Sequence, residues 1–491
     1  MVLSFVLPFN FILNFAHDDS FFYIKTAENF SKGLGSTFDG VNPTNGYHPL
    51  YFLTLVIIFI IPEYLFNASP ETLYRLVFSL HTVLIIFISF FVFKSLKLIL
   101  KEKFNNIFIS ILFLLLASFV FIRDYGLESH LAILFLSIFL YIKSKELTGE
   151  GEYPIIKSIL LSLIFLSRTD FVFSLIPFVL TTDVYLSHEK KRYSNYSVSI
   201  LLFTVLLYYT SNYIFFGHLE TVSGKLLNGF PRFLFVSNIK TLITDPAKLY
   251  NQFARIIFLI VSFVVFTLYF FKKGKEQEKV RKYLVLIFAM GAGSLFFTLI
   301  HLCFNVYSIR EWYMTLPVFV SIIMISLVFS EIKYLNVVSV ILAIVLFIGV
   351  FYGSRIGNYK YNYGYKYAKE LNKIIPKDDI IYQVDYCGVT AFFSDRKIIN
   401  GDGLINSFEY TDYLKAGKIG EYMKMKNVKY YSTYSQSNLL RDSVYTDDNF
   451  SDKVEGKVFV FPKSSLVMEM PFIWNHMAFD LEGKWYLFKF K

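Results

Sequence analysis

The stretch Ala16-His17-Asp18-Asp19-Ser20-Phe21-Phe22-Tyr23 lies at the boundary between an apolar N-terminal run and a long polar loop. Two adjacent carboxylates beside a membrane cost free energy unless a ligand, a proton or a partner charge compensates them. The simpler interpretation is a polar helix end followed by a turn-rich loop. The position that the rest of the chain gives to Asp18 and Asp19 decides between this interpretation and a functional site.

Long apolar runs dominate the rest of the chain. Of its 491 residues, 55% are hydrophobic and only 18% are charged, which indicates a polytopic membrane protein. The net charge of +10 comes mainly from Lys and Arg in short links between apolar runs. No soluble segment carries a basic stripe with interleaved aromatics, so nucleic acid is not a predicted partner. The two cysteines, Cys303 and Cys387, are too few for a disulfide framework or a cysteine metal site.

The apolar runs predict about 11 membrane-spanning helices. They cover 2–16, 49–62, 73–93, 105–122, 129–142, 155–167, 171–186, 198–216, 253–271, 283–302, 312–330 and 334–352. The run at 2–16 lacks the basic start and the small-residue cleavage site of a signal peptide, so it is predicted to be a retained first span. A span needs about 20 apolar residues, and the run at 49–62 is shorter.

The basic residues decide the placement of 49–62. If this run spanned the membrane, the Lys-rich links at 94–103 and 272–282 would face outside, on the side of the two first-loop carboxylates. If it lies in the outer interface, every basic link becomes cytoplasmic, as the positive-inside rule requires. We therefore predict a cytoplasmic N-terminus and an external first loop over 17–72. Further external segments are expected at 123–129, 167–170, 217–252 and 303–311.

Two regions of the chain depart from the pattern of long apolar runs. The runs beside Arg168-Thr169-Asp170 are short, so either two spans meet there or one buried helix carries a charged break. From 353 the sequence turns polar and Tyr-rich, with strand-like segments at Ile380–Val384 and Val428–Ser432. We predict a transmembrane domain over 1–352 and a soluble extracytoplasmic α/β domain over 353–491.

With this topology, most of the notable ionisable residues share the external face, and the middle of the membrane carries almost none. A carboxylate there can take the proton from an acceptor hydroxyl that attacks a sugar's anomeric carbon. Arg and Lys can bind a phosphate leaving group. This chemistry indicates glycosyl transfer from a polyprenyl-phosphate sugar. The candidate catalytic residues are Asp18 and Asp19, and the candidate donor- or acceptor-binding residues are His48, Glu128, Arg168, Asp170, His218, Lys225, Arg310 and Tyr313.

These residues also have structural interpretations. Glu128 suits the N-terminus of the helix predicted from 129. Arg168 and Asp170 form an ion pair as readily as a site, and Arg310 beside two aromatic residues suits an interfacial anchor. His48 and His218 are more typical of hydrogen-bonding loop residues than of metal ligands.

The motifs resemble those of a known family. Asp18-Asp19-Ser20-Phe21-Phe22-Tyr23, followed by Asn42-Pro43-Thr44-Asn45-Gly46-Tyr47-His48-Pro49, resembles the first-loop signature of GT-C fold membrane glycosyltransferases. These are polyprenyl-phosphate-sugar-dependent enzymes related to protein mannosyltransferases and to arabinofuranosyl- and aminoarabinose transferases. The resemblance continues at Gly126–Ser129, Leu166–Asp170, Phe216–Gly224, Arg310–Tyr313 and Asn400–Asn406. It implies juxtamembrane helices in the first loop and an external active site, where a first-loop Asp acts as base in an inverting transfer.

The resemblance leaves several points open. Some GT-C enzymes require a divalent metal such as Mg or Mn, for which Asp19, Asp124 and Glu128 are the candidate ligands here. The acceptor is a glycan, a lipid or a protein, and the protein is expected in the plasma membrane, in contact with membrane lipid. The alternative from another class is a transporter or flippase of lipid-linked sugars, which requires polar residues through the bundle. A binding scaffold for cell-envelope assembly is the third hypothesis.

Overall fold

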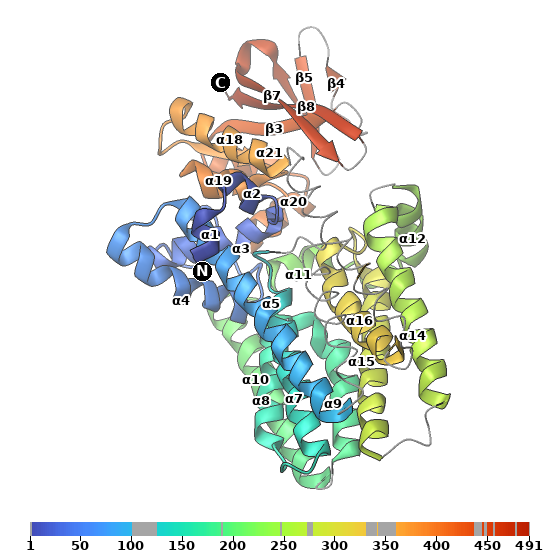
Figure 1. The fold of residues 1–491 in the computed structure, drawn as a ribbon. Helices are drawn as coiled ribbons and strands as arrows, with labels where there is room; N and C mark the ends of the chain where they lie inside the picture. The colour runs from blue at the N-terminus through green and yellow to red at the C-terminus, as the bar shows by residue number, and fades with distance from the viewer. Residues whose placement is uncertain are drawn as a thin grey trace.

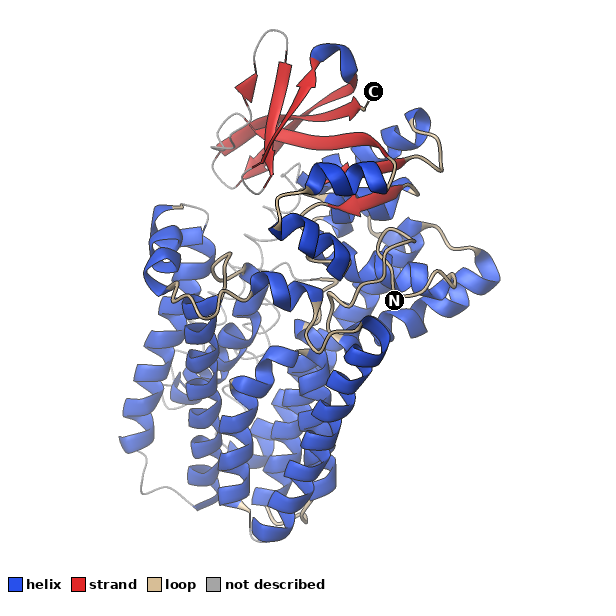
Figure 2. Cartoon of the chain, turned by 180° about the vertical axis from the view of Figure 1, so that it is seen from behind, coloured by secondary structure: helices blue, strands red, loops and turns tan. Residues whose placement is uncertain are grey.

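A bundle of long helices and a smaller C-terminal domain make up this computed structural model (Figure 1). The C-terminal domain is stacked on one end of the bundle, and the strands gather in it while the remainder is helical (Figure 2). The structure describes residues 2–100, 125–187, 190–245, 248–272, 278–329, 341, 360–436, 444–445, 449–454, 457–476 and 479–490.

The N-terminal segment does not form the continuous first span that the sequence predicted. It contains two five-residue helices, α1 (Val2–Val6) and α2 (Phe9–Leu13). Pro8 separates them, and proline can neither donate a backbone hydrogen bond nor continue a helix. The segment packs on the start of α5 (Pro70–Leu100), where the Arg75 guanidinium donates to the carbonyl oxygen of Leu7 at 2.9 Å.

The first loop contains α3 (Asp18–Ser31) and α4 (Pro49–Phe66). The length and hydropathy of α4 would suffice for a span. Both of its ends nevertheless lie beside the C-terminal domain: Gly46 packs against the Leu404 carbonyl, and Glu71 pairs with Lys369 at 2.7 Å. The helix therefore returns the chain to the same end of the bundle, and Figure 1 shows it beside the top of the bundle. Which side of the membrane this end faces stays a prediction.

The bundle contains most of the helices that can cross a membrane. Including α4, six described helices are long and apolar enough to do so. The bundle helices are α5, α7 (Ser129–Leu147), α8 (Pro154–Ser167), α9 (Leu175–Leu186), α10 (Lys190–Phe216), α14 (Ala254–Lys272), α15 (Glu278–Phe304) and α16 (Thr315–Phe329). Two predicted runs, at 105–122 and 334–352, lie outside the described residues apart from residue 341, so the count of 11 spans stays a prediction.

The chain reverses at the charged junction rather than continuing as one helix. A short 3-10 helix, η2 (Thr169–Phe173), separates α8 from α9. Lys157, near the start of α8, pairs at 2.9 Å with Asp183, near the end of α9. The two helices therefore run in opposite directions, and Arg168 and Asp170 lie at the turn. Shorter helices follow α10: α11 (Val222–Leu227), α12 (Phe235–Thr244), η3 (Leu249–Phe253) and, before α16, η4 (Glu311–Met314).

The C-terminal domain is α/β, which confirms the predicted fold class. Its main sheet has the order β2-β1-β3-β8-β7, parallel between β2, β1 and β3 and antiparallel from β3 onward. These strands are β1 (Ile380–Gln383), β2 (Lys397–Asn400), β3 (Val428–Gln436), β7 (Leu466–His476) and β8 (Phe479–Lys489). A second sheet contains β4 (Val444–Tyr445), β5 (Asn449–Val454) and β6 (Lys457–Pro462). The helices are α18 (Lys360–Ile374), α19 (Cys387–Ser394), α20 (Phe408–Lys415) and α21 (Ile419–Met425), and η5 (Lys463–Ser465) precedes β7.

Candidate active site

A cavity of about 450 Å³ lies where the first loop, the top of the bundle and the C-terminal domain meet. It brings together six of the residues singled out from the sequence, Asp18, Asp19, His48, Glu128, Arg310 and Tyr313. The C-terminal domain adds residues that the sequence did not single out, among them Asp385, Tyr386, Asp402 and Tyr434.

Asp18 is held between the two domains. One carboxylate oxygen accepts the N–H of Val389 at 2.9 Å and the other accepts that of Gly388 at 3.4 Å. Both donors lie in the first turn of α19, where N–H groups lack helical partners. A side chain on Gly388 would collide with the Asp18 carbonyl oxygen. Burial raises the pKa of Asp18 to about 6, although the Val389 bond opposes the shift.

Asp19 is the more accessible of the two carboxylates. Its side chain is 28% exposed, whereas Asp18 is buried. One Asp19 oxygen lies 3.6 Å from Nδ1 of His17, the residue that caps α3. The His17 ring packs on Trp312 at 4.4 Å. The N-terminal position on α3 is favourable for both acids, because the helix dipole stabilises negative charge there.

His48 and Glu128 form the wall next to this pair. His48 Nδ1 accepts the N–H of Thr169 at 3.2 Å, so the ring proton is assigned to Nε2, which lies 3.8 Å from a Glu128 oxygen. Burial lowers the pKa of His48 despite the nearby Glu128 charge, so the ring is neutral at pH 7. A neutral ring donates a hydrogen bond without adding charge to the cavity.

Arg168 lies behind the cavity and does not line it. Its guanidinium is buried, pairs with Glu128 at 3.2 Å, and forms a two-pronged pair with Asp170 at 2.7 and 3.2 Å. Its carbon also lies 5.0 Å from the centre of the Tyr313 ring. Burial alone would raise the pKa of Asp170, but Arg168, assisted by His301, holds it below the usual range. Arg168 and Asp170 thus form the structural ion pair, which positions Glu128.

His218 and Lys225 also lie outside the cavity. The His218 ring stacks on Phe408 of α20 at 3.8 Å, and Lys225 pairs with Asp412 at 3.1 Å. The two residues therefore join the loop after α10 to the C-terminal domain. They were candidates because the topology placed them on the external side. The sequence does not show that the C-terminal domain packs on the loop after α10.

Among the described residues that line the cavity, Arg310 is the one Lys or Arg side chain. It lines the cavity beside Tyr307, whose ring centre is 5.4 Å away. Within the described part of the chain, no carboxylate lies within 4 Å of its guanidinium. An arginine with its donors unoccupied can bind a phosphate through two hydrogen bonds.

Asp402 lies in Asn400–Asn406, one of the segments that resemble the family, but the sequence did not mark it as a site residue. It lies in the turn after β2, where its carboxylate accepts the N–H of Leu404 at 2.8 Å. Burial raises the pKa of Asp402 to about 7 despite that bond, and the charge of Asp19 contributes. The flanking Gly401 and Gly403 were a visible signal of a special turn, but no sequence pattern places residue 402 next to residue 19.

The metal site that the resemblance implied stays a prediction. The described residues contain no group of three His, Cys, Asp or Glu side chains placed to hold a metal ion. Of the candidate ligands, Asp124 lies outside the described residues and Glu128 is engaged by Arg168. We therefore assign no step of the reaction to a metal.

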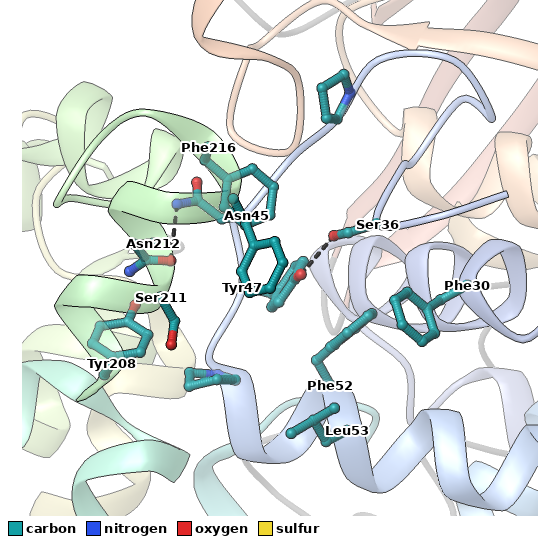
Figure 3. A pocket seen from close by; sticks show the side chains of 13 residues that line it. Phe30, Ser36, Asn45, Tyr47, Phe52, Leu53, Tyr208, Ser211, Asn212 and Phe216 are labelled. Carbon is teal, nitrogen blue, oxygen red and sulfur yellow. Dashed lines mark hydrogen bonds between the residues drawn. The ribbon is translucent and has the colours of Figure 1, made fainter. Parts of the chain in front are cut away.

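A second cavity of about 490 Å³ adjoins the first and is almost entirely apolar (Figure 3). Phe30, Phe52 and Leu53 of the first loop face Tyr208 and Phe216 of α10 across it. Tyr47 lines both cavities, with its ring stacked on Phe52 at 4.1 Å and its hydroxyl bonded to Ser36 at 2.5 Å. Asn45 bonds Asn212 at 3.2 Å and joins the loop to α10. The polar and apolar cavities thus meet at Tyr47.

This architecture is the GT-C fold, as predicted. No protein-family model matches the sequence, and no curated protein matches it either. Among solved structures, the chain resembles the crystal structure of ArnT from Cupriavidus metallidurans bound to undecaprenyl phosphate, with a TM-score of 0.54. The alignment covers 91% of this chain and 95% of that chain at 10% identity, so the likeness establishes the fold.

Proposed function

We propose that this protein is a membrane glycosyltransferase that moves a sugar from a polyprenyl-phosphate donor to a hydroxyl group of an extracytoplasmic acceptor. One observation carries the proposal: a polar cavity with two adjacent carboxylates and Arg310 meets an apolar cavity at Tyr47. A polyprenyl-phosphate sugar has the matching parts, a polar sugar, an anionic phosphate and an apolar chain. The fold shared with ArnT, which was crystallised with undecaprenyl phosphate, supports the proposal.

In the proposed reaction, the acceptor oxygen bonds to the anomeric carbon as the bond from that carbon to the phosphate oxygen breaks. The phosphate oxygen keeps the electron pair, and Arg310 stabilises its charge. The acceptor proton passes to a first-loop carboxylate, and attack opposite the leaving group inverts the anomeric centre.

We assign Asp18 as the base. A general base works best with a pKa near the working pH, and burial brings that of Asp18 to about 6. The Val389 and Gly388 N–H groups fix its orientation, and each oxygen retains a second lone pair for the acceptor proton. Asp19, the more exposed carboxylate, then positions the acceptor hydroxyl.

The test is direct. Purified protein in lipid nanodiscs is incubated with a panel of labelled polyprenyl-phosphate sugars, with and without a crude envelope acceptor fraction, and released polyprenyl phosphate is measured. We expect cleavage of one donor, and its loss in Asp18→Asn. Full activity in Asp18→Asn would falsify the assignment of Asp18 as the base, and full activity in Asp19→Asn as well would exclude both first-loop carboxylates. Transport of an intact donor across a vesicle membrane, without cleavage, would instead favour the transporter hypothesis.

A further inference from the structure

The two sides of the polar cavity differ in their cations. The membrane domain contributes Arg310 beside the carboxylates of Asp18 and Asp19, and its Glu128 is paired with Arg168. The C-terminal domain contributes two carboxylates, Asp385 and Asp402, and two aromatic rings, Tyr386 and Tyr434. Among the described residues, none that lines the cavity from the C-terminal domain is Lys or Arg. A phosphate-bearing donor therefore has its cationic partner at Arg310 and meets carboxylates on the C-terminal wall.

Asp402 occupies a fixed position on this wall. Besides its own bond to Leu404, its turn is held by the Gly403 N–H, which donates to Asn400 at 2.8 Å. The Tyr410 hydroxyl donates to the Gly401 carbonyl at 2.6 Å. A Cβ on Gly401 would lie 2.8 Å from the Tyr382 ring, so the turn packs closely on the sheet. A preorganised carboxylate of this kind binds a ligand with little loss of conformational entropy.

Tyr386 has an unusual backbone conformation. Its φ of +51° lies in the left-handed region, which is unfavourable for a residue other than glycine and is often found at functional sites. This backbone turns directly into α19, the helix that holds Asp18. The Tyr386 ring packs against Tyr434 at 4.7 Å and borders the cavity. The strained residue thus places an aromatic face next to the carboxylates.

Carboxylates with aromatic rings suit one class of ligand. Carboxylates accept hydrogen bonds from hydroxyl and amine groups but donate none when ionised. Tyrosine rings present apolar faces on which the C–H face of a sugar ring can pack. Besides burial, repulsion from Asp19 raises the pKa of Asp18, and repulsion from Asp19 and Asp18 raises the pKa of Asp402. An anionic acceptor would meet strong repulsion here, whereas a neutral or amine-bearing sugar would not.

We propose that the C-terminal domain forms the acceptor subsite, in which Asp402 binds the hydroxyl or amine groups of a neutral or amine-bearing glycan whose ring packs on Tyr386. This inference rests on the proposed function and selects a glycan from the acceptors considered above. Asp402 is a specificity residue: it binds the acceptor and takes no part in bond breaking.

The test separates acceptor use from donor chemistry. With the donor identified as above, donor hydrolysis by water and transfer to three labelled oligosaccharides are measured in parallel. The oligosaccharides are neutral, amine-bearing and uronic-acid-bearing. The variants are Asp402→Ala, Tyr386→Gly and, as a matched control, Glu409→Gln, which removes an exposed acid of the same domain.

We expect wild type to transfer to the neutral or amine-bearing oligosaccharide and to reject the uronic-acid one. In Asp402→Ala, transfer relative to hydrolysis should fall about tenfold through a higher acceptor KM, or about 1.4 kcal/mol. Tyr386→Gly should show the same selective loss without unfolding, because glycine adopts positive φ freely. Glu409→Gln should change neither reaction.

Three outcomes overturn the inference. Transfer and hydrolysis could fall equally in Asp402→Ala, transfer could be unchanged in that variant, or wild type could prefer the anionic acceptor. If wild type cleaves no polyprenyl-phosphate sugar at all, the proposed function itself fails and this inference falls with it.

Discussion

Two groups of charged residues lie at opposite ends of the bundle, and their pairing differs. At the end away from the C-terminal domain, Lys143, Lys157, Glu146 and Asp183 form a buried group from α7, α8 and α9. Each lysine contacts both acids, at 2.7–3.1 Å. At the other end, Arg310 has no carboxylate within 4 Å among the described residues, and five described acids border one cavity.

This difference distinguishes charged residues that stabilise the fold by pairing with one another from charged residues that are left available to a ligand. Buried ions are tolerated when attraction between them offsets the loss of hydration. The far-end group meets this condition internally, so it needs no ligand. The cavity group has both an excess of acid and a cation with no acidic partner, so a ligand with complementary charge completes it. Four substitutions test whether the two groups behave as differently as this contrast requires.

The largest effect is expected from Asp18→Asn. Removal of a general base typically lowers the rate by about 10²–10⁴-fold. The Asn oxygen can still accept the Val389 N–H, so the domains should stay docked and the melting temperature should change little. Steady-state donor cleavage and thermal unfolding are the two measurements. A large loss of stability with normal activity per folded molecule would assign Asp18 to domain docking alone.

The raised pKa of Asp18 should give activity and stability opposite dependences on pH. A base with a pKa of about 6 is active when ionised, so wild-type activity should rise as the pH passes 6. The folded-state pKa lies above the ordinary value of 3.8, so the Asp18 contribution to stability is fully present below pH 3.8 and is lost as the pH rises through 6. Melting temperatures over pH 4–8 should therefore fall more steeply in wild type than in Asp18→Asn, because Asp402, whose pKa is also raised, titrates in both proteins.

Asp183→Asn should produce the reverse pattern. The substitution removes the Asp183 carboxylate that pairs with the buried Lys143 and Lys157. Removing one partner of a buried ion pair typically destabilises a protein by about 3–5 kcal/mol. We expect a lower melting temperature but near-normal cleavage per folded molecule, since Asp183 lies at the other end of the bundle. Loss of catalysis at unchanged stability would contradict the division into two groups.

A smaller effect on catalysis is expected from Arg310→Ala. The loss of a charge-assisted hydrogen bond to phosphate costs about 1.5–3 kcal/mol, or roughly 10–150-fold in rate. Because Arg310 has no ion-pair partner among the described residues, stability should be nearly unchanged. Arg310→Lys should recover part of the activity as a point charge. Equal, full activity in both variants would remove Arg310 from the donor site.

Lys225→Ala should have the smallest effect. Its partner Asp412 is 70% exposed, and ion pairs of this kind contribute about 0–1 kcal/mol. We expect a shift of at most a few degrees in melting temperature and cleavage within about twofold of wild type. A loss of donor cleavage as large as that in Arg310→Ala would instead indicate that Lys225 binds the donor phosphate.

The difference between Arg310 and Arg168 also marks where prediction from sequence stops. Both residues follow a hydrophobic run and both were candidates for the donor phosphate. The structure pairs Arg168 with Glu128 and Asp170 inside the protein and leaves Arg310 at the cavity. Asp170 lies two residues from Arg168 and was an evident partner, but the contact with Glu128 spans 40 positions and no local pattern reports it.

Local properties of the chain were sufficient for the membrane class and the polar C-terminal α/β domain, and they predicted a functional role for the Asp18–Asp19 pair. Hydrophobic run length, charge placement and motif order act over a few residues, so they can be read one segment at a time. Tertiary packing decided that the N-terminal segment lies on the start of α5, that α4 lies beside the bundle, and that Asp402 joins the cavity. These results depend on contacts between distant segments, whose energies appear only when the whole chain is folded.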